Sequence, residues 1–136
     1  MRTTRIRVLG AVAASAALVG LASSPASAGT SVSSWGQSVK SSCANGSHGR
    51  FEDAGEIFNL TDSCADGWSA VLKVDVAPYK SDGGYDFTIW NTQSAGNTVS
   101  VNKAYAEGTG VCIQAGLGEY SSGEWGMWGY WTCGVS

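Results

Sequence analysis

Beyond its first 28 residues the sequence lacks an apolar run of the roughly 20 residues that a helix needs to cross a bilayer. It has one histidine, His48, and no C-x-x-C pair, so neither a zinc site nor a Ser-His-Asp triad finds support. No stretch keeps a helical period over more than one turn, which argues against an α-helical fold. Basic residues are scarce too, because five follow residue 28 against eleven acidic ones. This balance argues against nucleic acid and anionic membranes as partners.

The first 28 residues have the three parts of a secretory signal peptide. Three arginines form a basic start, residues 8–22 are apolar, and residues 26–28 give an A-x-A cleavage site. The apolar part is shorter than a membrane-spanning helix. We therefore expect a secreted, extracellular protein whose mature form has no membrane segment.

The residues from 29 to 136 suit one small domain, which we expect to be all-β. Residues 29–49 are rich in Ser and Gly and predict an extended arm, whereas residues 50–136 predict the folded domain. The expected strands are about seven in number: 50–52, 56–61, 68–76, 85–90, 98–102, 111–115 and 125–133. Such short strands with Gly-rich turns are typical of an antiparallel β-sandwich, with a small β-barrel as the alternative.

Four cysteines follow the signal peptide, and an even number in an exported chain predicts two disulfide bonds. Three pairings are possible. We favour Cys43 with Cys64 and Cys112 with Cys133, because the two pairs have the same spacing and each would join neighbouring strands. In the chain-entropy model each such loop contributes about 3 kcal/mol.

The run 125–133 carries much of the chain's aromatic content. If it is one strand, alternation sends two sets of side chains to opposite faces: Trp125, Met127, Trp131 and Cys133 to one, and Trp128 and Tyr130 to the other. A bond from Cys133 to Cys112 inside the sandwich would turn the first set inward. Trp128 and Tyr130 would then face outward, with Trp90 nearby, as a binding surface.

No residue set predicts catalysis, a cofactor or a metal site. The acidic residues that could form a glycosidase pair show no spacing that places two across a bond: Glu52, Glu56, Glu119 and Glu124. Asp62, Asp66 and the 82–86 loop offer oxygen ligands for calcium but do not follow the calcium-loop motif. Aspartate at turns is the commoner reason for such a pattern.

We therefore predict a secreted, non-catalytic module that binds another exported protein, as an adaptor or subunit of an exported assembly. The candidate binding residues are Trp35, Trp90, Trp128 and Tyr130. One alternative is a lectin-like, carbohydrate-binding module that uses the same aromatic side chains with polar neighbours such as Asn91, Gln93 and Glu124. Another alternative is inhibition of a secreted hydrolase through a loop such as 119–124.

Two segments carry a resemblance to a known group of proteins. They are residues 51–71, FEDAGEIFNLTDSCADGWSAV, and residues 106–120 with AEGT, Cys112 and a closing GEY. In these motifs the chain resembles an uncharacterised group of small exported, disulfide-bonded β-proteins of actinobacteria. Some proteins of this kind are similar to adaptor subunits of secreted umbrella toxin particles, in which the adaptor joins a scaffold to a lectin. The resemblance implies a compact β-domain and a protein partner.

Overall fold

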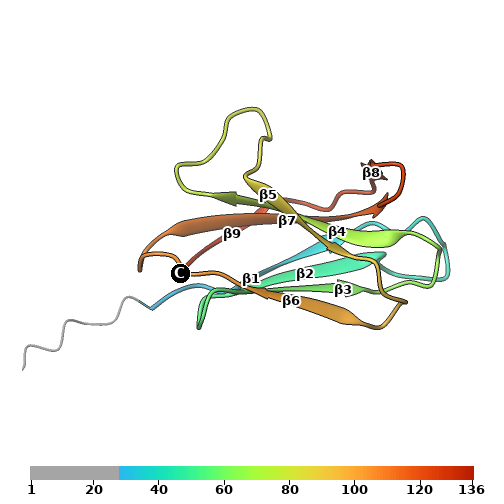
Figure 1. Cartoon of the computed structure of the whole chain (residues 1–136), viewed down its shortest axis with the longest axis horizontal. Helices are drawn as coiled ribbons and strands as arrows, with labels where there is room; N and C mark the ends of the chain where they lie inside the picture. Colours follow the sequence, from blue (N-terminus) through green and yellow to red (C-terminus); the bar gives the residue numbers. More distant parts are fainter. Residues whose placement is uncertain (1–27) are drawn as a thin grey trace, which may run out of the picture.

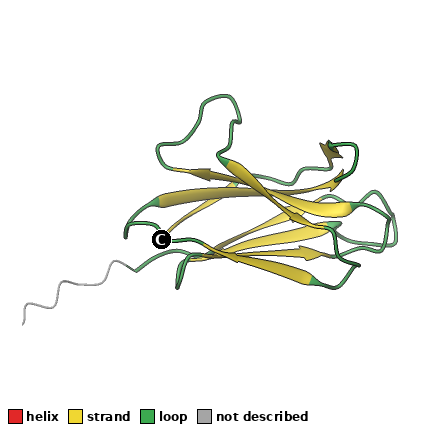
Figure 2. Ribbon diagram, in the orientation of Figure 1, coloured by secondary structure: helices red, strands yellow, loops and turns green. Residues whose placement is uncertain are grey.

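The computed structural model describes residues 28–136, so the predicted signal peptide, apart from Ala28, lies outside the described residues. The described residues form nine strands and no helix, in two antiparallel sheets packed face to face (Figures 1 and 2). The strands are β1 (Val32–Gly36), β2 (Ser47–Glu52), β3 (Ile57–Asp62), β4 (Ser69–Val76), β5 (Phe87–Asn91), β6 (Thr98–Asn102), β7 (Gly110–Glu119), β8 (Glu124–Gly126) and β9 (Thr132–Val135). The predicted β-sandwich is confirmed, and the described strands do not close into a barrel.

One sheet has the strand order β1-β2-β3-β6, and the other has the order β5-β4-β7-β8. β7 is the longest strand, with ten residues. It pairs with β4 along one side and with both β8 and β9, one after the other, along its other side. In the part of the chain that the structure describes, no helix is long and apolar enough to span a membrane.

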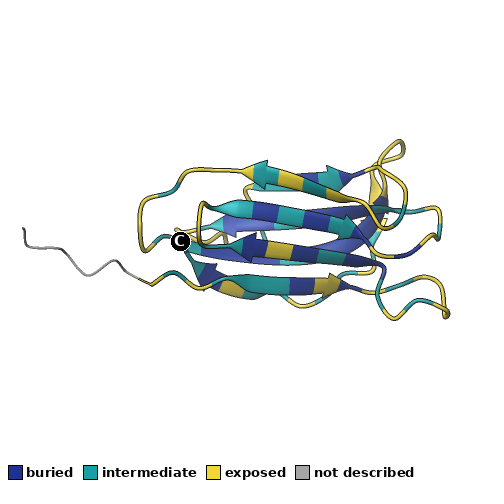
Figure 3. Cartoon of the chain, turned by 90° about the horizontal axis from the view of Figure 1, so that it is seen from below, coloured by how far each residue is buried: buried dark blue, intermediate teal, exposed yellow. Residues whose placement is uncertain are grey.

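The core lies between the sheets and follows from the alternation of side chains along each strand (Figure 3). Its fully buried members include Phe51, Phe58, Leu60, Leu72, Val74 and Ile113. Each such side chain contributes roughly 1.5–3 kcal/mol relative to an exposed position. The alternation in 68–76 predicts one inward face with Trp68, Ala70, Leu72, Val74 and Val76, and the structure confirms Ala70, Leu72 and Val74 in the core.

The segment 29–49, expected to be an extended arm, contains an integral strand of the sandwich. β1 pairs along its whole length with β2, from Val32 opposite Phe51 to Gly36 opposite Ser47. Its other side meets the C-terminal segment. Thr30 forms a bridge with Val135, and the Ser34 hydroxyl donates to the Tyr130 carbonyl oxygen at 2.8 Å. One margin of the sandwich is thereby closed by hydrogen bonds between the two sheets.

The structure contains both disulfides in the favoured pairing. Cys43–Cys64 joins the segment after β1 to the segment after β3. Cys112–Cys133 joins β7 to β9. The expected position of the second bond is wrong, however. Because Val111 and Ile113 point into the core, alternation turns Cys112 to the outer face of its sheet, and the partner Cys133 is exposed.

The C-terminal run is two strands with an irregular segment between them, which corrects the prediction of one strand. Leu117 pairs with Gly126 and Ile113 with Thr132, so the three residues 114–116 of β7 face the five residues 127–131. Because the number of extra residues is even, the strands on either side keep the same alternation, and Trp125 and Cys133 share a face as predicted. That face is the outer one, because Gly118, which pairs with Trp125, alternates with the buried Leu117. Trp128 lies in the irregular segment and covers Gly116 on the same outer face.

Candidate functional site

The outer face of the five-stranded sheet depends on two glycines of β7. Odd-numbered residues from 111 to 117 are buried on the inner face, so Gly116 and Gly118 face outward. A Cβ atom at Gly118 would lie 2.7 Å from the Trp90 ring, and one at Gly116 would overlap the Trp128 ring. The two glycines thus leave the space in which two indole rings lie directly on the backbone of β7.

Five side chains cover this face and form what we call the aromatic layer: Tyr85, Trp90, Tyr120, Trp125 and Trp128. Trp125 is at its centre. Its ring is parallel to that of Trp90, with 6.1 Å between centroids, and meets Tyr85 and Trp128 edge-on at 5.8 and 5.7 Å. Such pairs contribute roughly 0.5–1.5 kcal/mol each beyond the area they bury. The layer is therefore a second packed cluster outside the sandwich core.

The ammonium group of Lys73, on β4, lies over three rings of the aromatic layer. Its Nζ lies 3.9 Å from the centroid of Trp128 and 5.3 Å from those of Tyr85 and Trp125. The ring faces attract the ammonium group, whereas burial among them lowers the pKa of Lys73. The layer thus holds a cation of its own chain.

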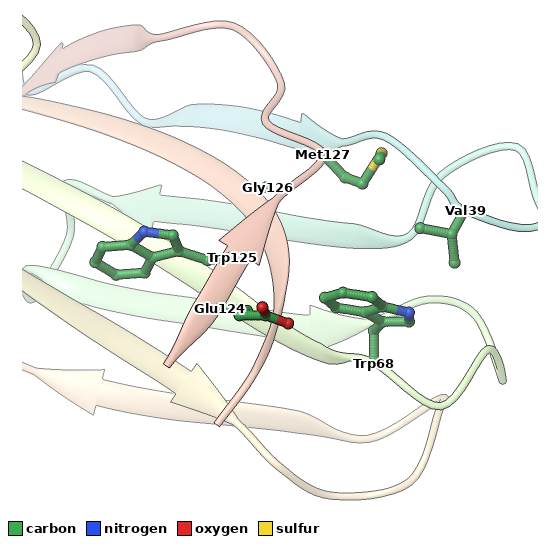
Figure 4. A pocket seen from close by; sticks show the side chains of 6 residues that line it. All are labelled: Val39, Trp68, Glu124, Trp125, Gly126 and Met127. Carbon is green, nitrogen blue, oxygen red and sulfur yellow. The ribbon is translucent and has the colours of Figure 1, made fainter. Parts of the chain in front are cut away.

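A groove of about 450 Å³ opens beside the layer, at the end of β8 (Figure 4). It is lined by Val39, Trp68, Glu124, Trp125, Gly126 and Met127. Val39, Trp125 and Met127 remain 43%, 39% and 44% exposed, so their apolar surfaces are accessible. In Figure 4 the Glu124 carboxylate lies between the rings of Trp68 and Trp125. The groove is therefore apolar with one acidic side chain.

The four predicted binding residues do not form one surface. Trp90 and Trp128 both belong to the aromatic layer, where Trp125 contacts each of them. Tyr130 lies in the irregular segment after β8 and is 90% exposed. Trp35 lies on β1, in the opposite sheet. Trp131 is half-buried and lines a separate hollow with Cys112 and Cys133.

Trp35 stacks on His48, its cross-strand neighbour, with 3.7 Å between ring centroids. Nε2 of His48 is buried and has no hydrogen-bond partner among the described residues. Burial, followed by the nearby Arg50 charge, lowers the pKa of His48. The arrangement is an aromatic pair on a polar face, with Trp35 itself 50% exposed.

A second pocket, of about 420 Å³, lies on the other side of Trp68. Half of its lining residues are polar, namely Asp62, Ser69, Thr92, Gln93 and Ser94. Burial raises the pKa of Asp62, and the Asp66 charge adds to the effect. The polar residue Asn91 does not belong to this surface. It is fully buried, and its amide nitrogen donates to the carbonyl oxygens of Leu60 and Asn97.

Sequence reasoning missed Val39, Trp68, Trp125 and Met127 as accessible site residues. The core assignment of Trp125 relied on the expectation that the Cys112–Cys133 bond lies inside the sandwich, whereas the bond is on the outer face. The sequence of β7 did contain a signal for the aromatic layer. Gly116 and Gly118 alternate with the apolar residues Ala115 and Leu117, and two outward positions without side chains leave room for rings to cover the strand. Among the described residues, no group of three or more His, Cys, Asp or Glu side chains is placed to hold a metal ion.

The fold and the groove together define a small disulfide-bonded β-sandwich with an aromatic outer face. Comparisons with protein-family models, curated proteins and solved structures found no match to this chain.

Proposed function

We propose that this protein is an exported, non-catalytic binding module that holds another exported protein through the groove beside the aromatic layer. The observation that supports this proposal is the composition of the groove. Four apolar side chains from three segments of the chain line it, and Glu124 is its one charged residue. Protein interfaces are centred on such apolar pockets with few charges, and tryptophan is prominent among their energetically important residues.

The partner's chemistry follows from the shape and charge of the groove. An apolar anchor side chain fits among Val39, Trp68 and Met127, and a neighbouring Lys or Arg would pair with Glu124. The excess of acidic over basic residues after residue 28 favours the same partner. Trp125 is held by Tyr85, Trp90 and Trp128, so little side-chain entropy is lost when a partner covers it.

The position of Trp35 supports the finer proposal of an adaptor or assembly subunit. Trp35 and His48 lie on the outer face of the four-stranded sheet, whereas the aromatic layer covers the outer face of the other sheet. The two surfaces therefore point in opposite directions. A protein that joins two partners needs two such surfaces, and β1 provides the second one.

A displayed random-peptide library tests the groove proposal. We expect the chain spanning residues 29–136 to select peptides with an apolar residue next to Lys or Arg. Glu124→Lys should change the selected neighbour from basic to acidic, and Met127→Glu should abolish selection. Tyr79→Glu is the matched control, since Tyr79 is 51% exposed but does not line the groove. Unchanged peptides from the Glu124 and Met127 variants would contradict the proposal.

The polar pocket favours carbohydrate binding as a second candidate function. Sugars stack on aromatic rings and bond to small polar groups, and here Trp68 stands beside Thr92, Gln93 and Ser94. A panel of methyl glycosides, followed by NMR at the Trp68 indole, separates the two functions. Shifts that Gln93→Ala removes and Met127→Glu leaves intact would support a sugar site. Unshifted indole signals would leave the groove as the site.

A further inference from the structure

The two margins of the four-stranded sheet differ in how they end. β1 is met by the C-terminal segment, through the Thr30–Val135 bridge and a hydrogen bond from Gln37 N–H to the Met127 carbonyl oxygen. β6 forms the other margin and pairs with β3 alone. In Figure 3 it is the outermost strand in which exposed and half-buried residues alternate. β6 thus leaves an open strand edge along the described sheet.

The backbone groups on this open edge can be assigned from the hydrogen bonds at its two ends. Lys103 N–H donates to the Glu56 carbonyl oxygen, and Asp62 N–H donates to that of Asn97. In an antiparallel ladder, bonded and non-bonded positions alternate, so Val99 and Val101 also bond to β3. Thr98, Ser100 and Asn102 consequently direct their N–H and C=O groups away from β3.

The sequence of β6, Thr-Val-Ser-Val-Asn, is nearly palindromic about Ser100. If a second copy lay antiparallel with the two Ser100 residues opposite each other, Thr98 would face Asn102 of that copy. Every outward-directed backbone group would then meet another one. Val99 and Val101, which are half-buried against the core, would face each other across the junction. We propose that β6 pairs with β6 of a second copy around a two-fold axis at Ser100.

The side chains of β6 do not oppose this pairing. The strand contains no charged residue, no proline and no bulge, which are the features that usually protect a sheet edge. Lys103 follows the strand directly, and in the proposed register the two Lys103 residues lie about 20 Å apart, beyond the screening length at physiological salt. The junction is small compared with the roughly 800 Å² per partner of a stable interface, so the dimer should be weak and concentration-dependent.

Single-cysteine variants test the register. Opposed, hydrogen-bonded residues have Cα atoms about 5.5 Å apart, which suits a disulfide. Ser100→Cys should therefore form a covalent dimer under mild oxidation. Asn102→Cys is the matched control on the same exposed row, because the two copies of residue 102 would lie about 13 Å apart. Equal cross-linking rates for the two variants would overturn the proposal.

Sedimentation of the protein without an engineered cysteine gives a second test. We expect the sedimentation coefficient to rise with concentration, and Ser100→Lys to remove that rise, because it places like charges opposite each other at the two-fold axis. Ser33→Lys is the control on the far margin of the same sheet, and it should leave the rise intact. A monomer at every concentration up to about 1 mM would overturn the proposal. This outcome does not affect the groove, which lies beside the other sheet.

Discussion

The outer faces of the two sheets arise from the same alternation of side chains, but one is mostly polar and the other is covered by aromatic rings. On the four-stranded sheet the outward residues are mostly polar, such as Arg50, Asn59 and Ser100, and Trp35 stacks on His48 among them. On the five-stranded sheet, outward glycines in β7 allow the aromatic layer to pack directly on the backbone. The comparison teaches that two successive outward glycines in a strand can support a second packed layer. The groove lies beside this layer, and the layer holds Trp125, which lines the groove, in place.

The two outer faces should differ most in how much stability is lost when one ring is removed from each. Trp128→Ala removes a ring that contacts Trp125, Lys73 and Gly116, and we expect a loss of about 2–4 kcal/mol in the free energy of unfolding. Trp35→Ala removes a half-exposed ring and should cost less than about 1 kcal/mol. Urea unfolding measures both. Equal losses would mean that the aromatic layer is not a packed cluster.

A smaller change tests whether the layer needs the glycines of β7 beneath its rings. Gly116→Ala places a Cβ atom against the Trp128 ring and should cost about 1–3 kcal/mol through displacement of that ring. Gly126→Ala is the matched control, because a Cβ atom there meets nothing within 4 Å. Thermal unfolding and tryptophan fluorescence report stability and ring environment. Similar results for both variants would show that the ring moves aside without cost.

The smallest expected effect is the pH dependence of stability that His48 causes on the outer face of the four-stranded sheet. Burial lowers the pKa of His48 below its usual 6.5, so the unfolded chain takes up the proton first as the pH falls. The contribution of His48 to stability is complete above that value and is lost as the pH falls from 6.5 through the folded pKa. Melting temperatures across this window should decline in the natural chain and less steeply in His48→Gln. Parallel curves would contradict the prediction.

Much of the fold could be predicted because it depends on local patterns. The period-two alternation in 68–76 identified the core face of β4, and the spacing of the cysteines led to the observed pairing. The strand at 32–36 was missed because a Ser-rich stretch carries little apolar alternation, and β1 gains its stability from pairing with β2 and from the C-terminal segment. The resemblance to exported actinobacterial proteins and the predicted secretion stay predictions.

The sequence by itself determined that residues 28–136 are all-β, contain two disulfides and carry an excess of acidic groups, since alternation, cysteine number and charge are properties of the chain alone. Only the tertiary structure decided which tryptophans are accessible. The five residues 127–131 opposite three in β7 do not follow strand alternation, and this places Trp128 on the same face as Trp125. Contacts with both β7 and β1 hold this irregular segment, and the Ser34–Tyr130 hydrogen bond to β1 spans 96 residues of sequence, so local periodicity could not predict it.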